Sequence, residues 1–135
     1  MTALLVLGAG LLGLVIGSFL NVVVHRVPRG ESVVLVAERA GAVTGFVQLF
    51  PMFSSVRTAR IWVLNDLYVA ANARRCGFAR ALLDAAVRFA GEDGAARIVL
   101  ETDRGNAPAR ALYRAAGWAE DDSQWYSLSL AQREV

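Results

Sequence analysis

Hydrophobic positions divide the chain into one uninterrupted apolar segment and a longer region of short apolar runs separated by polar residues. Residues 3–24 contain no charged side chain. At a helical rise of ~1.5 Å per residue, these 22 residues would extend about 33 Å, which exceeds the roughly 30 Å core of a bilayer. The pattern predicts an N-terminal hydrophobic helix that could span a membrane.

Two arrangements of this helix are open. The basic residues Arg26 and Arg29 follow the apolar segment, so the positive-inside tendency would place the rest of the chain in the cytoplasm, anchored to the inner membrane by residues 3–24. The helix could instead pack on the sheet of a soluble or homodimeric protein. In either case we expect two domains, a hydrophobic helix and loop at 1–34 and a folded domain at 35–135.

Beyond this boundary the pattern alternates between strands and helices. Short apolar runs at 35–38 and 45–50 flank a turn-like stretch and predict a hairpin, followed by a loop at 51–59 and a strand at 61–69. We expect the helix that follows to end near Gly94, because glycine readily adopts the left-handed conformation after a helix. Its apolar positions recur at helical spacing and are Ala79, Leu82, Leu83, Ala86 and Phe89.

Three further elements complete the pattern. Residues 97–102 predict a strand, and Asn106 is expected to cap a second helix with Pro108 in its first turn and Gly117 at its end. Apolar residues alternate with serine over 126–130, which predicts a half-buried last strand. Together the elements predict an α/β fold with one mixed central sheet flanked by helices.

The segment before the first long helix has the features of an anion-binding loop. Gly77 and Ala79 lie where that helix must begin, and small residues there let backbone N–H groups approach a bound group closely. The helix N-terminus adds a partial positive charge of roughly half a unit, so we expect a phosphate or pyrophosphate to bind. The chain contains no lysine, which excludes a P-loop, and too few small residues fit the dinucleotide fingerprint.

The loop sequence Arg74-x-x-Gly77-x-Ala79 resembles motif A of the GCN5-related N-acetyltransferases, the GNAT superfamily. A second stretch, residues 106–118, reads Asn-x-x-Ala-x-x-Leu-Tyr-x-x-x-Gly-Trp. It is similar to a family element that ends in Gly-Phe, with Trp in place of Phe. Because both motifs occur in the family's order, residues 35–131 are identified as GNAT-like. The resemblance implies a mixed-sheet fold that here lacks the usual first strand and first two helices.

The resemblance also implies a function, transfer of an acetyl group from acetyl-CoA to a small-molecule or peptide amine. Tyr113 would be the general acid that protonates the departing thiolate, since a phenol with a pKa near 10 is a suitable donor. Asp66 is the first choice for the base that takes the proton from the amine, because it precedes Leu67 on the strand expected to line the thioester, and Glu101 on the adjacent strand is the other candidate. An inactive acyl-CoA-binding remnant is the first alternative. The positions expected to bind acetyl-CoA are Leu67, Tyr68, Val69, Arg74, Arg75, Cys76, Gly77, Phe78, Ala79, Arg80 and Asn106.

Residues 8–34 carry a second resemblance, to the first membrane helix and following loop of type IV prepilin peptidases. It implies an apparent chimera joined near Val34. That family's membrane-boundary aspartates and four-cysteine zinc loop have no counterpart here, so we do not expect peptidase activity. A membrane interaction fragment derived from such a peptidase is the second alternative.

Composition excludes other classes of function. Fourteen basic and twelve acidic residues give a net charge of only +2, so we expect no nucleic-acid-binding surface. The single cysteine, Cys76, excludes an intramolecular disulfide. With His25 as the single histidine, a His/Cys metal cluster is also excluded, and we expect no metal site.

Overall fold

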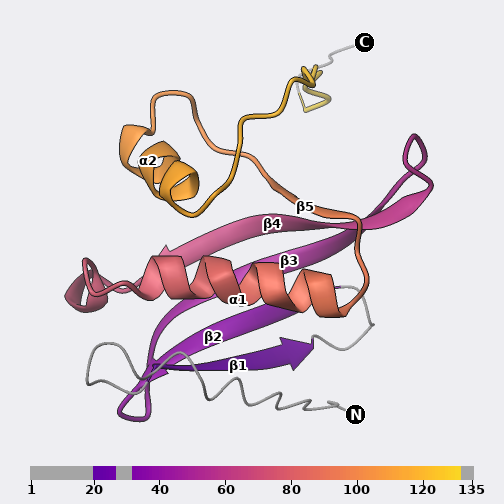
Figure 1. The fold of residues 1–135 in the computed structure, drawn as a ribbon. Helices are drawn as coiled ribbons and strands as arrows, with labels where there is room; N and C mark the ends of the chain where they lie inside the picture. Colours follow the sequence, from indigo (N-terminus) through magenta and orange to yellow (C-terminus); the bar gives the residue numbers. More distant parts are fainter. Residues whose placement is uncertain (1–19, 27–31, 132–135) are drawn as a thin grey trace.

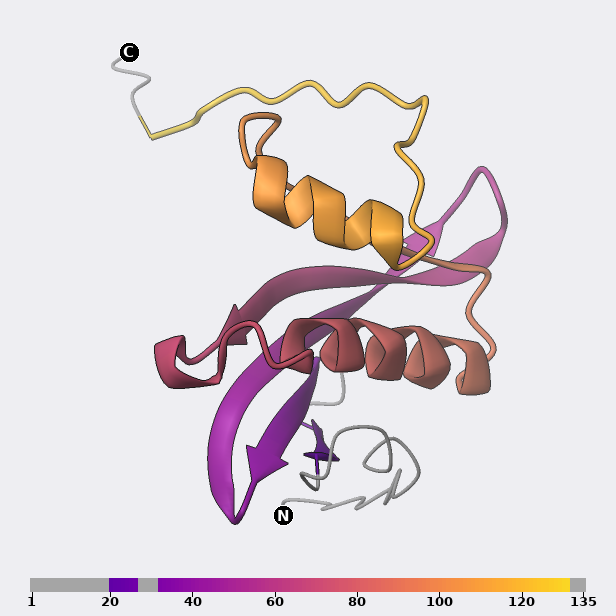
Figure 2. The same cartoon turned by 60° about the vertical axis from the view of Figure 1, so that its left-hand side comes forward.

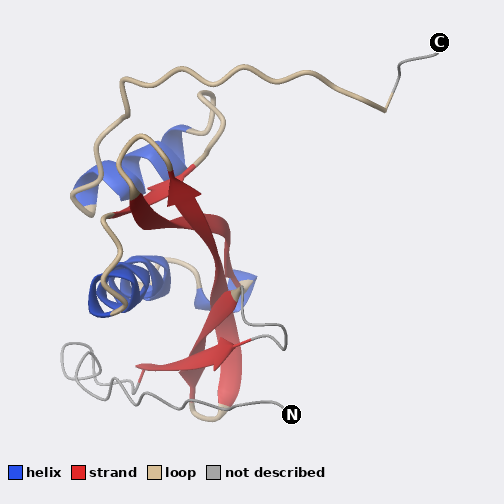
Figure 3. Cartoon of the chain, turned by 90° about the vertical axis from the view of Figure 1, so that its right-hand side faces the viewer, coloured by secondary structure: helices blue, strands red, loops and turns tan. Residues whose placement is uncertain are grey.

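The computed structural model describes residues 20–26 and 32–131, which form one five-stranded sheet and two α-helices (Figure 1). The strand order is β1-β2-β3-β4-β5; neighbouring strands are antiparallel except β4 and β5, which are parallel. Both α-helices lie on the same face of the sheet (Figure 3). The strands are β1 (Leu20–Arg26), β2 (Val33–Arg39), β3 (Ala42–Ser54), β4 (Ala59–Val69) and β5 (Arg97–Leu100). The helices are a short 3-10 turn η1 (Ala71–Ala73), α1 (Phe78–Glu92) and α2 (Ala107–Ala115).

The hairpin expected around residues 39–42 is confirmed. Strand β2 alternates buried and half-buried positions, as a strand with one face on a core must. Ala40 and Gly41 both have positive φ, 50° and 79°, so they form the tight connection whose twist matches two antiparallel strands. This hairpin places Leu35 and Ala37, almost fully buried, beneath α1.

The loop expected at 51–59 is wrong over its first half, because β3 continues to Ser54. The ladder with β4 runs without a break from Pro51↔Trp62 to Ser54↔Ala59. A proline is tolerated here because β2 pairs with β3 only as far as Leu49, which leaves one edge of this part of β3 free of strand pairing in the described residues.

Helix α1 supplies the apolar layer that covers the sheet. Its buried residues follow the helical period expected from the sequence, and Leu82 and Leu83 are fully buried. Phe89 packs edge-on against Trp62 of β4, with 5.1 Å between ring centroids. The expected end is confirmed, since Gly94 has a φ of 78° directly after the C-cap residue Asp93.

The expected helix over residues 3–24 is wrong at its C-terminal end, because residues 20–24 belong to β1. β1 pairs with β2 along its whole length, from Leu20↔Arg39 to Arg26↔Val33. Three consecutive valines, residues 22–24, favour an extended backbone, and pairing covers an edge of β2 that would otherwise be open. The expectation that no strand precedes β2 is therefore also wrong, and the sheet begins before the boundary expected near residue 34.

The rest of the predicted hydrophobic helix, residues 3–19, lies outside the described residues. Within the described ranges, no helix is both long enough and apolar enough to cross a membrane.

The half-buried last strand expected at 126–130 is wrong as well. This segment has no regular secondary structure, and Tyr126 and Leu128 are 88% and 68% exposed. Alternation shows only that a segment could have one apolar face in a strand, whereas a strand also needs a partner. In the part of the chain that the structure describes, no strand pairs with this segment.

Candidate active site

A cleft opens where β4 and β5 separate. The two strands are paired only over Ile61–Leu64 and Arg97–Leu100. Beyond Leu64, β4 contains a bulge: Leu49 pairs with Leu64 and Gln48 with Asp66, so Asn65 has no partner on β3. The cleft has a volume of about 470 Å³ and is lined by Val63, Leu64, Asn65, Glu101, Thr102 and Asp103.

After the bulge, β4 presents backbone groups on the side where β5 has ended. The Ala70 N–H donates to the Thr44 carbonyl (2.7 Å), so even-numbered residues of this part of β4 face β3. Because backbone direction alternates along a strand, Leu67 and Val69 turn their N–H groups to the open side. The backbone of Tyr68 faces β3, and its half-exposed ring packs on Phe46 at 5.8 Å between centroids.

The loop between β4 and α1 ends in a helix N-terminus that no side chain caps. Gly77 is the N-cap residue and has a φ of 80°, a left-handed conformation that glycine adopts without steric cost. Arg75 is also left-handed, at 61°. The first turn of α1 contains no acidic residue, and its leading N–H groups have no intrahelical acceptors. An uncapped helix N-terminus of this kind is compatible with an anion, and the anion site expected from the sequence stays a prediction.

The side chains of this loop differ in what they can offer a ligand. Arg74 is folded back on β4, where its Nε donates to the Val69 carbonyl (3.1 Å). Arg80 joins the two helices: its Nε donates to Asp84, and its NH1 donates to the Ala115 carbonyl (3.0 Å). Phe78 is 4% exposed and packs in the core, so only its backbone is available to a ligand.

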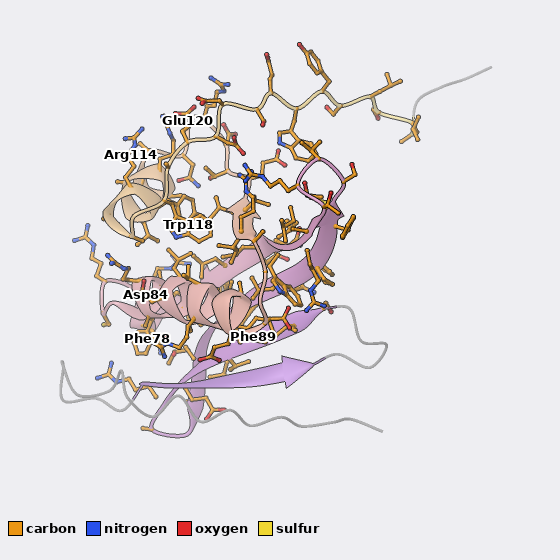
Figure 4. All side chains as sticks on the ribbon, turned by 45° about the vertical axis from the view of Figure 1, so that its right-hand side comes forward. Phe78, Asp84, Phe89, Arg114, Trp118 and Glu120 are labelled. Atoms are coloured by element: carbon orange, nitrogen blue, oxygen red, sulfur yellow. The ribbon has the colours of Figure 1, made fainter. Side chains whose placement is uncertain are left out.

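Helix α2 places Tyr113 beside the core. The Asn106 carboxamide oxygen accepts the Ala109 N–H (3.3 Å), which confirms the expected N-cap. Tyr113 is half-buried, and its ring lies 6.2 Å from that of Trp118, which lies between α1 and α2 (Figure 4). Burial raises the pKa of the Tyr113 phenol above its ordinary value of 10.0, so the hydroxyl stays protonated throughout the neutral range.

A family model for the acetyltransferase (GNAT) family matches residues 19–118. The chain belongs to this family. It is 47% identical over 96 residues to an uncharacterized N-acetyltransferase, YhfO, of Bacillus subtilis; the match covers 71% of this chain and 64% of YhfO. The chain thus spans less than two thirds of the length of that curated relative.

Solved structures show the same fold. A probable acetyltransferase is 39% identical with a TM-score of 0.71, over 76% of this chain and 70% of that one. A ribosomal-protein-alanine N-acetyltransferase from Brucella melitensis is 27% identical with a TM-score of 0.65, over 74% and 72% of the two chains. The family match begins at residue 19, and none of these comparisons supports the second resemblance, to prepilin peptidases.

The two carboxylates considered for a GNAT-type base lie in different places. Glu101 follows β5 directly and lines the cleft. Asp66 follows the bulge, is exposed, and accepts a hydrogen bond from the Asn65 carboxamide (3.0 Å). It pairs with Gln48 and is not among the residues that line the cleft. The structure therefore brings Glu101 to the cleft with Asn65, and leaves Asp66 one position beyond it.

Sequence reasoning missed Asn65, Thr102 and Asp103, which also line the cleft. The signal for the first was present: two consecutive polar residues, 65 and 66, interrupt an otherwise apolar strand. Such an interruption is compatible with a bulge, because the alternation of faces shifts by one residue there.

Proposed function

We propose that this chain is an acetyl-CoA-dependent N-acetyltransferase that acts on a small-molecule or peptide amine. The observation that carries the proposal is the continuity of two backbone surfaces, the open edge of β4 at Leu67 and Val69 and the uncapped N-terminus of α1 at Gly77. The edge of β4 suits an extended chain of amides, and the N-terminus of α1 suits a diphosphate. Acetyl-CoA carries both groups in that order.

The residues present fit this cofactor. The N–H groups of the first turn of α1 and the exposed Arg75 side chain would hold the pyrophosphate. The outward N–H groups of Leu67 and Val69 would pair with the amides of the pantetheine arm, as a neighbouring strand would. The Arg74 guanidinium already bonds the loop to β4, and the Arg80 guanidinium already bonds α1 to α2. These two residues would therefore mainly hold the loop and the helix in position for the cofactor.

Bound acetyl-CoA supplies a thioester, an acyl group already activated toward an amine. The protonated Tyr113 phenol would give its proton to the departing sulfur. Glu101, in the cleft, would take the proton that the attacking amine loses, directly or through one water molecule. We place Glu101 ahead of Asp66 in this role because only Glu101 lines the cleft.

The acceptor is proposed only as a class, a primary amine on a small molecule or peptide. The named activity of the Brucella melitensis relative, acetylation of a ribosomal-protein alanine, illustrates the peptide case. The cleft itself contributes carboxylate, carboxamide and hydroxyl side chains, which can accept hydrogen bonds from an amine.

Calorimetric titration of acetyl-CoA into the intact chain tests cofactor binding. Gly77→Glu adds bulk and negative charge to the N-terminus of α1, and Gly94→Glu is a matched control at the opposite end of the same helix. The two glycines have nearly equal φ, 80° and 78°, so the backbone strain of substitution is similar. We expect micromolar binding that Gly77→Glu abolishes and Gly94→Glu retains. Absence of binding by the folded wild-type chain would overturn the proposal.

Tyr113→Phe separates an enzyme from an acyl-CoA-binding remnant. The variant keeps the ring that packs on Trp118 and removes only the hydroxyl. We expect acetyl-CoA binding within about twofold of wild type and turnover lower by about 100-fold, the usual contribution of a general acid. Turnover is followed as acetylated product from a panel of primary amines, since a thiol reagent would also react with the exposed Cys76. A chain that binds acetyl-CoA but acetylates no amine would be a remnant.

A further inference from the structure

The last turn of α2 ends in backbone carbonyl groups that the helix itself cannot satisfy. The carbonyls of residues 112–114 accept N–H groups from the residues that follow the helix, at 2.9–3.1 Å. The Ala115 carbonyl is bonded differently, because it accepts from NH1 of Arg80 on α1 (3.0 Å). A side chain from the neighbouring helix therefore caps the end of α2 that carries Tyr113.

Arg80 is better placed to stabilise α2 than its own helix. It lies in the first turn of α1, where the partial positive charge of the helix N-terminus disfavours a cation. The same charge is favourable at the C-terminus of α2, and α2 lies over the N-terminal half of α1 (Figures 1 and 2). Both carboxylate oxygens of Asp84, one turn along α1, accept from Nε of Arg80 (3.1 and 3.2 Å). Asp84 therefore directs the guanidinium toward α2.

The apolar contact that holds α2 is narrow. No side chain of α2 is fully buried. Leu112 and Tyr113 of the helix, with Ala116 and Trp118 just after it, are partly buried and pack against the core. A helix held along a single apolar edge can rotate about that edge, and a hydrogen bond at one end restricts the rotation. The bond from Arg80 supplies this restraint at the end of α2.

We propose that Arg80, directed by Asp84, is a positioning residue for Tyr113. Tyr113 lies two residues before Ala115, so the bond from Arg80 fixes the turn of α2 that carries the phenol. Without this bond the phenol would be displaced, and a displacement of about 1 Å can cost about 100-fold in rate. The inference rests on the proposed function, in which Tyr113 is the general acid. It differs from the role that the family resemblance implies, because Arg80 acts on the acid and not on the phosphates.

Steady-state kinetics and acetyl-CoA titration of Arg80→Ala separate the two roles. The acceptor in the kinetic assay is the primary amine that the wild type acetylates fastest in a panel. We expect kcat to fall about tenfold and the acetyl-CoA dissociation constant to stay within about threefold of wild type. Arg88→Ala, the same change at an exposed arginine of α1, is the control and should alter neither value. Weaker acetyl-CoA binding with an unchanged kcat would identify Arg80 as a phosphate ligand and overturn the proposal.

A double-mutant cycle shows whether the effect of Arg80 passes through Tyr113. The hydroxyl is already absent in Tyr113→Phe, so adding Arg80→Ala should lower kcat by less than about a further twofold. A tenfold fall that persists in the Tyr113→Phe background would refute the positioning role. Arg80→Lys keeps the positive charge but lacks the fork that bonds Asp84 and Ala115 together, so kcat should stay low. Full activity of Arg80→Lys would show that charge alone matters, which also refutes the role.

Titration of the Tyr113 phenol tests the same contact without turnover. Burial raises the pKa of this phenol above 10.0, so displacement of α2 into solvent should return the pKa toward 10.0. The titration is measured as the tyrosinate absorbance of each chain minus that of its Tyr113→Phe counterpart. We expect a lower pKa in Arg80→Ala and an unchanged pKa in Arg88→Ala; an unchanged pKa in Arg80→Ala would overturn the inference. A wild type that acetylates no amine would overturn the proposed function instead, and the titration would still decide whether Arg80 fixes Tyr113.

Discussion

Gly45 is the position where the smallest substitution should disturb the edge of β4 that is proposed to bind the pantetheine arm of acetyl-CoA. It lies on β3 opposite Val69 of β4. A methyl group there would lie 2.5 Å from the Tyr68 carbonyl oxygen and 3.3 Å from both the Val69 Cα and a Leu82 methyl group. Contacts under 3.0 Å are essentially never seen for a real Cβ, and the closest atom is backbone, so β3 and β4 must separate.

The magnitude follows from this geometry. Relieving the contact requires β4 to move by roughly half an ångström or more, and such overpacking typically costs about 1–3 kcal/mol of unfolding free energy. For a chain of 135 residues the corresponding fall in Tm is roughly 4–11 °C. The displaced residues, Tyr68 and Val69, border the edge proposed to hold the pantetheine arm. Because a displacement of about 1 Å can cost 100-fold in rate, we expect turnover to fall by about tenfold or more in Gly45→Ala.

Urea denaturation of Gly45→Ala measures the loss of stability, and an acetylation assay with a panel of primary amines measures the loss of turnover. Gly91→Ala is the matched control, the same chemical change in the last turn of α1 with no atom within 4 Å of the added methyl group. We expect the control to be neutral or stabilised by up to about 1 kcal/mol, because alanine is the better helix former. A Gly45→Ala variant whose unfolding free energy lies within about 0.5 kcal/mol of wild type, and whose turnover is unchanged, would refute the predicted clash.

Three other predictions concern the core and pH. Asp93→Ala should lower the unfolding free energy by about 1–3 kcal/mol in urea denaturation, because Asp93 accepts hydrogen bonds from the buried Trp62 indole (2.9 Å) and from Arg60. Glu92 is the exposed neighbour of Asp93, so Glu92→Ala should leave the unfolding free energy unchanged. Leu82→Ala should cost about 2–5 kcal/mol by the same measurement, since Leu82 is fully buried. Burial raises the pKa of Tyr113, so its contribution to stability is full below pH 10 and is lost as pH rises through the raised pKa. The unfolding free energy should therefore fall less at alkaline pH in Tyr113→Phe than in wild type. Identical pH profiles of the unfolding free energy would contradict the raised pKa of Tyr113.

Local sequence signals were sufficient for the elements whose boundaries depend on neighbouring residues. The first hairpin, the extent of α1 and the cap of α2 rest on turn residues, helical periodicity and a capping side chain, each contained within a few positions. The glycine loop is of the same kind, because a left-handed Gly77 before an apolar helix defines it. These features could be predicted because the energies that decide them are local.

Elements decided by pairing could not be predicted in this way. The apolar run that ends in Val22–Val24 suits a helix or a strand, and its pairing with β2 decides for the strand over residues 20–24. The loop predicted at 51–59 starts at Pro51, yet β3 continues through this residue because one edge of the strand is free at that point. Residues 126–130 alternate as a strand should, and their expected burial would need a partner strand that the described part of the chain does not supply.

The cleft is produced by one backbone irregularity, and this explains why its residues were hard to find. If Asn65 were paired, β4 would keep a single register with β3 through to Val69, and β5 would have a regular edge to follow beyond Leu64. The bulge adds one residue on β4, so the strands diverge at the level where Leu64 pairs with Leu100. Glu101 is the next residue on β5, and it therefore enters the cleft at the height of Asn65. A change that paired Asn65 with β3 would therefore remove the cleft, and it would also turn the Leu67 and Val69 N–H groups away from the open side of β4.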